Sequence, residues 1–112
     1  MVGYMKEIAP SQFDSEVVHS EVPVLVDFYT QSCGPCRTMS PILAEMEIES
    51  SGTLKIVKID AAADGPFSAS FRVNAVPTFL LFNRGQQVGH LIGARGKKEL
   101  AKWVKDSIGA TS

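Results

Sequence analysis

The stretch VPVLVDFYTQSCGPCRTMSPIL, residues 22–43, decides the fold of this chain. Its first part, Val22 to Tyr29, is rich in β-branched and aromatic residues, which is typical of a buried strand. From Cys36 to Ser50 apolar residues recur at helical spacing and predict a helix. Cys33 and Cys36 are the only cysteines of the chain, and we expect them at the turn from this strand into this helix.

This placement favours redox chemistry at the cysteine pair. The first turn of a helix has unpaired backbone N–H groups and the positive end of the helix dipole, and both stabilise a thiolate relative to a thiol. Cys33, which directly precedes the helix, is therefore the predicted nucleophile. Cys36, one turn into the helix, would face back toward Cys33 and is the predicted resolving thiol.

Other roles for the two cysteines fit the sequence less well. A purely structural disulfide across so short a loop would remove little chain entropy from the unfolded state. A zinc site needs four ligands. His19 and His90 are far apart in the sequence, and the chain has no second CxxC, so no metal site is expected. A pair of inert buried cysteines remains an alternative, although it is less typical of a CxxC that opens a helix.

Further motifs stand in order along the chain. They are Val26-Asp27-Phe28, CGPCR at 33–37, Pro41 within the predicted helix, Lys58-Ile59-Asp60, Val76-Pro77-Thr78, Gly85 and Gly93. In this order and spacing, from about Phe13 to Ile108, the sequence resembles the thioredoxin family. The resemblance implies an α/β fold, the thioredoxin fold, in which a central mixed five-stranded sheet is flanked by four helices. Residues 1–112 would form a single domain, in agreement with the chain length.

The remaining elements follow from local patterns. Strands are expected at 4–9, 54–60, 78–82 and 87–92, and the last two would form a hairpin around Asn83-Arg84-Gly85. Helices are expected at 11–19, with Ser11 as N-cap, and at 64–71 and 96–108. The only tryptophan, Trp103, belongs to the apolar stripe of the last helix, so we expect it to lie away from the cysteines.

Asp27 is a carboxylate within an apolar strand, where burial without a partner would be costly. The resemblance implies that Lys58, on the adjacent strand, is its partner and that Asp27 relays the proton of Cys36. Burial would raise the pKa of Asp27 and an ammonium group would lower it, so the sequence leaves the direction open. An exposed carboxylate at the strand end is the alternative.

The residues between and before the cysteines also bear on the chemistry. Gly34 and Pro35 resemble the dipeptide of reducing members of the family. The family usually has Trp where this chain has Ser32, and the preceding strand usually has Trp where this chain has Tyr29. Ser32 would leave a smaller and more polar rim for partners, either as neutral variation or as a change of specificity.

Three more residues enter the predicted site through the resemblance alone. Pro77 is expected to follow a cis peptide bond, which would set the backbone of Val76 beside the cysteines, where an extended substrate strand could pair with it. An ordinary trans proline at a strand start is the alternative. Gly93 is expected at the rim where partners approach, or else is a plain turn glycine.

The resemblance implies a protein-disulfide reductase, a dithiol electron carrier that works by thiol–disulfide exchange through a redox-active Cys33–Cys36 disulfide. Its partners would be disulfide-containing client proteins and a thioredoxin reductase, and it would need no bound cofactor. Two alternatives stay open. One is a thiol oxidase, isomerase or redox sensor with a higher potential, and the other is a binding subunit that uses only the fold.

Composition and charge exclude several other classes. A net charge of −1 provides no basic face for nucleic acid or anionic lipid. No segment approaches the roughly 20 apolar residues of a membrane span, and the first ten residues lack the apolar stretch of a secretory signal. We therefore expect a cytoplasmic monomer, in a compartment where a CxxC is more often catalytic than structural.

Overall fold

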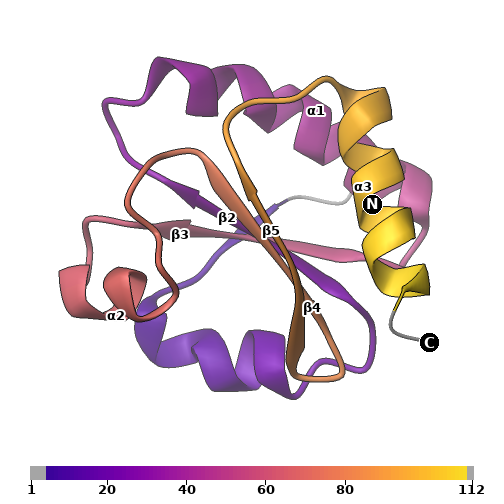
Figure 1. Ribbon diagram of the computed structural model, residues 1–112, viewed down its shortest axis with the longest axis horizontal. Helices are drawn as coiled ribbons and strands as arrows, with labels where there is room; N and C mark the ends of the chain where they lie inside the picture. The colour runs from indigo at the N-terminus through magenta and orange to yellow at the C-terminus, as the bar shows by residue number, and fades with distance from the viewer. Residues whose placement is uncertain (1–4, 111–112) are drawn as a thin grey trace.

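A mixed sheet runs through the middle of the molecule (Figure 1), and the computed structural model describes residues 5–110. The strands lie in the order β1-β3-β2-β4-β5. Strands β1, β3 and β2 are mutually parallel, whereas β4 is antiparallel to both β2 and β5. The strand bounds are β1 (Lys6–Glu7), β2 (Val24–Tyr29), β3 (Lys55–Asp60), β4 (Thr78–Asn83) and β5 (Gln86–Ile92). The predicted five-stranded mixed sheet is confirmed.

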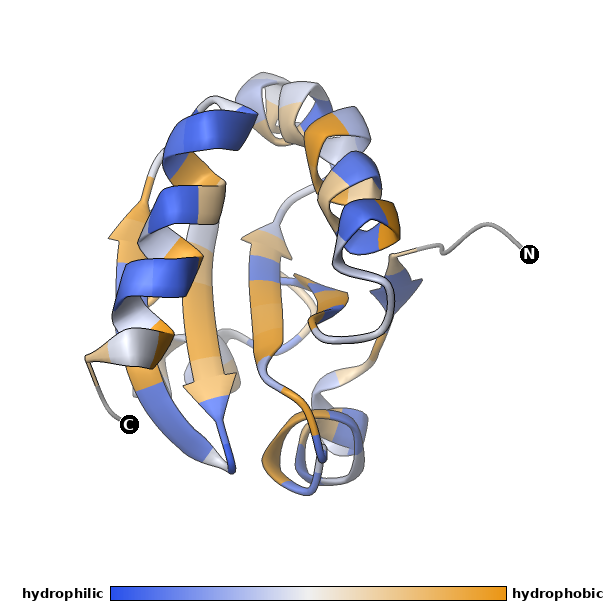
Figure 2. Cartoon of the chain, turned by 90° about the vertical axis from the view of Figure 1, so that its right-hand side faces the viewer, coloured by the Kyte–Doolittle hydropathy of each residue, from blue (hydrophilic) through white to orange (hydrophobic). Residues whose placement is uncertain are grey.

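Helices cover both faces of this sheet (Figure 1). On one face lie α1 (Gly34–Ser50) and α3 (Lys97–Gly109), which pack on Leu25, Ile56 and Leu81. On the other face lie α2 (Gly65–Ser70) and two short turns, η1 (Pro10–Gln12) and η2 (Asp14–Val18). Figure 2 shows the apolar strands enclosed between the helices, with the hydrophilic residues of α3 on its outer side. None of the helices within residues 5–110 combines the length and apolar composition that a membrane crossing requires.

Strand β2 is the centre of this arrangement, and all six of its residues are buried. A strand with helices on both faces needs apolar residues on both, which explains the nearly continuous apolar run in the sequence. Side chains alternate between the faces: Val24, Val26 and Phe28 join the core beneath α2. Asp27 shares the other face with Leu25 and Tyr29, beneath α1. The polar residue of the central strand therefore points toward the helix that starts with the cysteine motif.

The N-terminal segment differs from the predicted single helix over 11–19. It forms a 3₁₀ turn at Pro10–Gln12 and then a π-helical turn at Asp14–Val18. Ser11 is not the N-cap, because Ala9 precedes the turn and its N–H donates to the side-chain oxygen of Gln12 at 2.8 Å. The first strand is also shorter than predicted, at Lys6–Glu7, and its predicted start at Tyr4 lies outside the described residues.

The hairpin between β4 and β5 is confirmed. Arg84 and Gly85 both have positive φ, 55° and 78°, which is the geometry of a tight turn that matches the twist of two antiparallel strands. A Cβ atom at position 85 would lie 2.9 Å from the carbonyl oxygen of Val18. Glycine is thus required here by both the backbone conformation and the space.

We expect Gly89→Ala, in the middle of β5, to destabilise the protein by about 1–3 kcal/mol. The added Cβ would lie 2.6 Å from Cζ2 of Trp103, so that the indole or the whole of α3 must shift. Without this contact, alanine would be favoured over glycine in a strand. Urea denaturation measures the difference, with Gly65→Ala as the control because its Cβ meets nothing within 4 Å. A Gly89→Ala protein as stable as the wild type would contradict this packing of Trp103.

Candidate active site

The two cysteines lie where β2 passes into α1. Cys33 is the N-cap of α1, and its Sγ accepts a hydrogen bond from the backbone N–H of Cys36 at 3.1 Å. The connecting loop is closed by the Cys33 N–H, which donates to the carbonyl of Thr30 at 3.2 Å. Pro35 stands in the first turn, where the N–H that proline lacks would have no helical partner in any case. The helix terminus therefore points one of its free N–H groups at the sulfur of Cys33, as the spacing predicts.

Cys33 and Cys36 form a disulfide, with their Cα atoms 5.3 Å apart. Both residues are buried, with 8% and 5% of their surface exposed, and they pack with Tyr29 and Val76. The two cysteines are almost equally buried. They differ in position, because Cys33 precedes the helix and Cys36 lies inside its first turn. The structure thus describes the oxidised state of a pair that can accept two electrons.

Asp27 is fully buried, so the alternative of an exposed carboxylate at the strand end is wrong. Neither of its carboxyl oxygens accepts a hydrogen bond from a described residue. Burial raises the pKa of Asp27 to about 7, and the nearby charge of Lys58 only partly opposes this. The direction that the sequence left open is therefore upward, and the group can exchange a proton near neutral pH.

Lys58 is the register neighbour of Asp27 on β3, as expected, but the two side chains form no ion pair in the described part of the chain. Its Nζ atom instead lies over the ring of Tyr29, 4.3 Å from the ring centroid. Lys58 therefore acts on Asp27 through its charge and without direct contact. The aromatic ring lies on the same face of the sheet and can bind the ammonium group.

Tyr29 takes part in a network that the sequence reasoning missed. Its hydroxyl donates to Oε2 of Glu7 at 2.5 Å and accepts a longer hydrogen bond, 3.4 Å, from Nε2 of Gln31. Burial, together with the Glu7 carboxylate, raises the pKa of Tyr29 above its ordinary value, so the phenol remains a donor. The alternation of side chains along β2 already places Tyr29 on the face of Asp27. Glu7 lies within the strand predicted at 4–9, but no sequence pattern indicates that this strand brings it to Tyr29.

The other predicted residues belong to two parts of the molecule, one around Val76 and Pro77 and one at the start of α1. The Val76–Pro77 peptide bond is cis, and Val76 packs against the cluster that contains both cysteines. Gly93 has a φ of 97°, which favours glycine, and its N–H donates to the carbonyl of Pro77 at 2.8 Å. Ser32, Gly34 and Pro35 are exposed on the side of the rim formed by the start of α1.

Two hollows lie near the cysteine cluster. An open groove of about 330 Å³ is lined in part by Val76, which packs against the cysteines, and includes residues that no motif singles out. It is lined by Thr30, Ala61, Ala62, Val73, Asn74, Ala75 and Val76. A smaller cavity of about 130 Å³ reaches Cys36. It is lined by Tyr29, Thr30, Gln31, Cys36, Arg37, Ser40 and Lys58.

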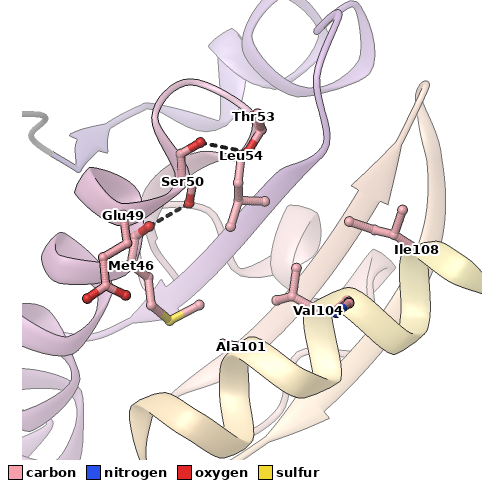
Figure 3. Close-up of a pocket in the computed structure, with 9 residues that line it drawn as sticks. Met46, Glu49, Ser50, Thr53, Leu54, Ala101, Val104 and Ile108 are labelled. Carbon is pink, nitrogen blue, oxygen red and sulfur yellow. Dashed lines mark hydrogen bonds between the residues drawn. The ribbon is translucent and has the colours of Figure 1, made fainter.

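A third hollow, of about 280 Å³, lies between the C-terminal half of α1 and α3, away from the cysteines (Figure 3). Met46, Leu54 and Val104 line it, and the side chain of Ser50 donates to the carbonyl of Met46 at its edge. It contains none of the predicted site residues. No group of three potential metal ligands occurs within residues 5–110, and His19 and His90 are exposed.

Reduction of the disulfide is expected to leave the fluorescence emission of Trp103 almost unchanged. The indole packs on Gly89 and on the core beneath α1 and α3, whereas the cysteines pack with Tyr29 and Val76. Emission spectra before and after reduction with dithiothreitol measure this directly. A several-fold rise on reduction would mean that the disulfide quenches Trp103, in contradiction to the packing of α3.

The chain is similar to thioredoxins over nearly its whole length. A family model described as Thioredoxin matches residues 4–106. The thioredoxin of Haemophilus influenzae is 39% identical over 101 residues, which cover 90% of this chain and 94% of that protein. The thioredoxin of Rickettsia felis is 35% identical, with coverages of 90% and 96%. A bifunctional thioredoxin reductase/thioredoxin of Mycobacterium leprae is 35% identical over 95% of this chain, which spans 23% of that longer protein.

Proposed function

The chain belongs to the thioredoxin family and is a protein-disulfide oxidoreductase, and from that premise we propose the part that each residue of the site plays. The observation that carries the proposal is the Cys33–Cys36 disulfide at the start of α1, with the Sγ of Cys33 accepting a helix N–H. The same N–H would stabilise negative charge on this sulfur once the disulfide is reduced. Cys33 is therefore the nucleophile.

In the first step the Cys33 thiolate attacks one sulfur of a client disulfide. A bond forms between Cys33 and the client, the client disulfide breaks, and the second client sulfur leaves as a thiolate. In the second step the Cys36 thiol loses its proton and attacks the Sγ of Cys33. The Cys33–Cys36 disulfide forms, the mixed disulfide breaks, and the client leaves as a dithiol after protonation, so that two electrons pass from the carrier to the client.

Asp27 serves as the proton relay for Cys36. The proposal is supported by a carboxyl group that is buried on the face beneath α1, accepts no hydrogen bond from a described residue and has a pKa of about 7. The cavity that adjoins both Cys36 and Lys58 has room for water, which would carry the proton. Lys58 acts on this relay through its charge.

Client proteins bind at the rim. The backbone of Val76, which packs against the cysteine cluster, would pair with an extended client segment, and the groove beside it would receive client side chains. Gly93 allows close approach on one side, while Ser32 presents a small polar surface on the other. Gly34 and Pro35 hold the start of α1 between the cysteines.

The oxidised carrier is recycled by a thioredoxin reductase. The Mycobacterium leprae relative, whose name joins a thioredoxin reductase and a thioredoxin, supports this partnership. We further propose that the protein works as a cytoplasmic monomer in electron transport, that it keeps the disulfide as its only redox group, and that residues 1–112 form one domain. A higher-potential oxidase, isomerase or sensor, and a purely binding role, find no support in the comparisons.

The reduction potential of the Cys33–Cys36 pair tests the direction of electron flow. We expect a value below a glutathione poise of roughly −220 to −260 mV, as a disulfide reductant requires. The potential is measured by equilibration in defined thiol buffers, followed by alkylation and mass analysis of the free thiols. A potential well above that range would instead indicate an oxidant, an isomerase or a sensor.

A further inference from the structure

Lys58 lies in register between two carboxylates. Parallel pairing places Glu7 of β1 on one side of it and Asp27 of β2 on the other, so the three side chains form a row across the sheet beneath α1. Neighbouring strands are about 4.8 Å apart, a span that a lysine side chain covers easily. Yet no ion pair joins Lys58 to either carboxylate in the described part of the chain. The ammonium group lies over the ring of Tyr29 instead.

The ring of Tyr29 offers the ammonium group a binding surface at this position. Tyr29 is two residues beyond Asp27 on β2, on the same face, and Nζ of Lys58 lies 4.3 Å from its ring centroid. A cation over the face of an aromatic ring is attracted by the ring quadrupole. The ring itself is fixed by the hydrogen bond from its hydroxyl to Glu7 and by packing against both cysteines.

We propose that Tyr29 is a positioning residue for the resolving step, because its ring holds the Lys58 ammonium group over its own face and away from the Asp27 carboxyl group. This inference rests on the proposed role of Asp27 as proton relay. An ammonium group in direct contact with Asp27 would fix the carboxyl in its charged form, which accepts a proton poorly. With Lys58 held on the ring, Asp27 can both take and return the proton of Cys36.

The titratable and charged groups described around the row act as follows. Lys58 is the charge that acts on Asp27, whereas Tyr29 faces Glu7 on β1 and Asp60 on β3. On the α1 side, Arg37 lines the same cavity as Lys58 but donates its guanidinium to the carbonyl of Gln31 at 3.0 Å. A change in the titration of Asp27 on replacement of Tyr29 is therefore attributable to Lys58 if it disappears when Lys58 is neutralised.

The experiment is a ¹³C NMR titration of the Asp27 carboxyl in the oxidised protein, where neither cysteine titrates. We expect Tyr29→Leu to lower the Asp27 pKa by about one unit, because Lys58 is then free to approach the carboxyl group. Tyr29→Phe and Tyr29→Trp keep a ring and should lower it by less. In a Lys58→Met background, Tyr29→Leu should no longer lower it. The pH profile of mixed-disulfide resolution should move in the same direction in each variant.

Two outcomes would overturn the proposal. A fall of the same size with and without Lys58 would mean that the ring acts only by keeping water from Asp27, and an equal fall in Tyr29→Phe would mean that the ring is not what holds Lys58. If Tyr29→Leu does not fold, the Asp27 pKa is measured in Tyr29→Phe and Tyr29→Trp, each with and without Lys58→Met. A fall of the same size in both backgrounds would then overturn the proposal. The titration uses no client and no turnover, so it can fail while the proton relay stands, and it can succeed even if Asp27→Asn resolves mixed disulfides normally.

Discussion

Cys33→Ser is expected to abolish catalysed reduction of disulfide substrates, whereas Cys36→Ser is expected to complete only the first exchange and to accumulate a mixed disulfide. The difference follows from position, because only Cys33 has its sulfur at the start of α1, in contact with a free helix N–H. Serine is nearly the same size as cysteine, so the packing with Tyr29 and Val76 should remain. In either variant, the rate of disulfide reduction should fall to the uncatalysed rate.

The measurement is mass analysis of each variant after incubation, in its reduced form, with a peptide that contains one disulfide. Cys36→Ser should gain the mass of the peptide and lose it again on addition of dithiothreitol, and Cys33→Ser should gain nothing. His19→Ala, an exposed change on the opposite side of the sheet from α1, serves as the control and should turn over normally. Trapping by Cys33→Ser instead of Cys36→Ser would reverse the assignment of the two cysteines.

Replacement of Asp27 by leucine is expected to make the protein more stable above pH 7 by up to about 4 kcal/mol. The pKa of this carboxyl is about 7 in the folded protein, compared with an ordinary value of 3.8. Between these two values the folded protein binds a proton that the unfolded chain has lost, so the stability of the wild type falls as the pH rises through this window. Above pH 7 the loss is complete, and Asp27→Leu avoids it.

Urea denaturation of the oxidised proteins at several pH values between 4 and 9 measures this difference. The difference between the wild type and Asp27→Leu should widen from pH 4 to pH 7 and then stay constant, whereas the control Gly65→Ala, which changes no titratable group, should show no such trend. A constant stability difference across the whole range would mean that Asp27 is charged in the folded protein.

The same position should also matter for the rate of the resolving step. Asp27→Asn should slow resolution of a trapped mixed disulfide at pH 7 by about 10²-fold or more.

The parts of the site that depend on local sequence could be predicted. The apolar run of β2 and the helical spacing of α1 define the turn at Cys33, and the helix terminus then follows from ordinary backbone geometry. The positions of Pro77 and Gly93 came from the family resemblance, because nothing in their own surroundings indicates that the chain brings them to the cysteines. The N–H of Gly93 donates to the carbonyl of Pro77, and this hydrogen bond joins residues of two different segments.

The position of Lys58 and the direction of the Asp27 pKa shift could not be predicted, because each depends on competition between partners. Lys58 can reach Asp27, but the ring of Tyr29 competes for the ammonium group, and the result depends on where Glu7 places the phenol. The direction of the Asp27 pKa depends on the same balance, since burial and a nearby charge act in opposite directions. The N-cap at Ser11 was wrong because Pro10 starts a 3₁₀ turn and Gln12 caps it from within.

The edges of the sheet restrict how an extended client can associate with this protein. At one edge, β1 has only two residues, Lys6 and Glu7, and both are exposed and charged. At the other edge, the pairing of β5 with β4 is interrupted by a bulge next to Phe82. Short, charged or bulged edges discourage another strand from pairing along them. A partially unfolded client should therefore pair poorly along either edge, which should protect the protein from co-aggregating with its own clients.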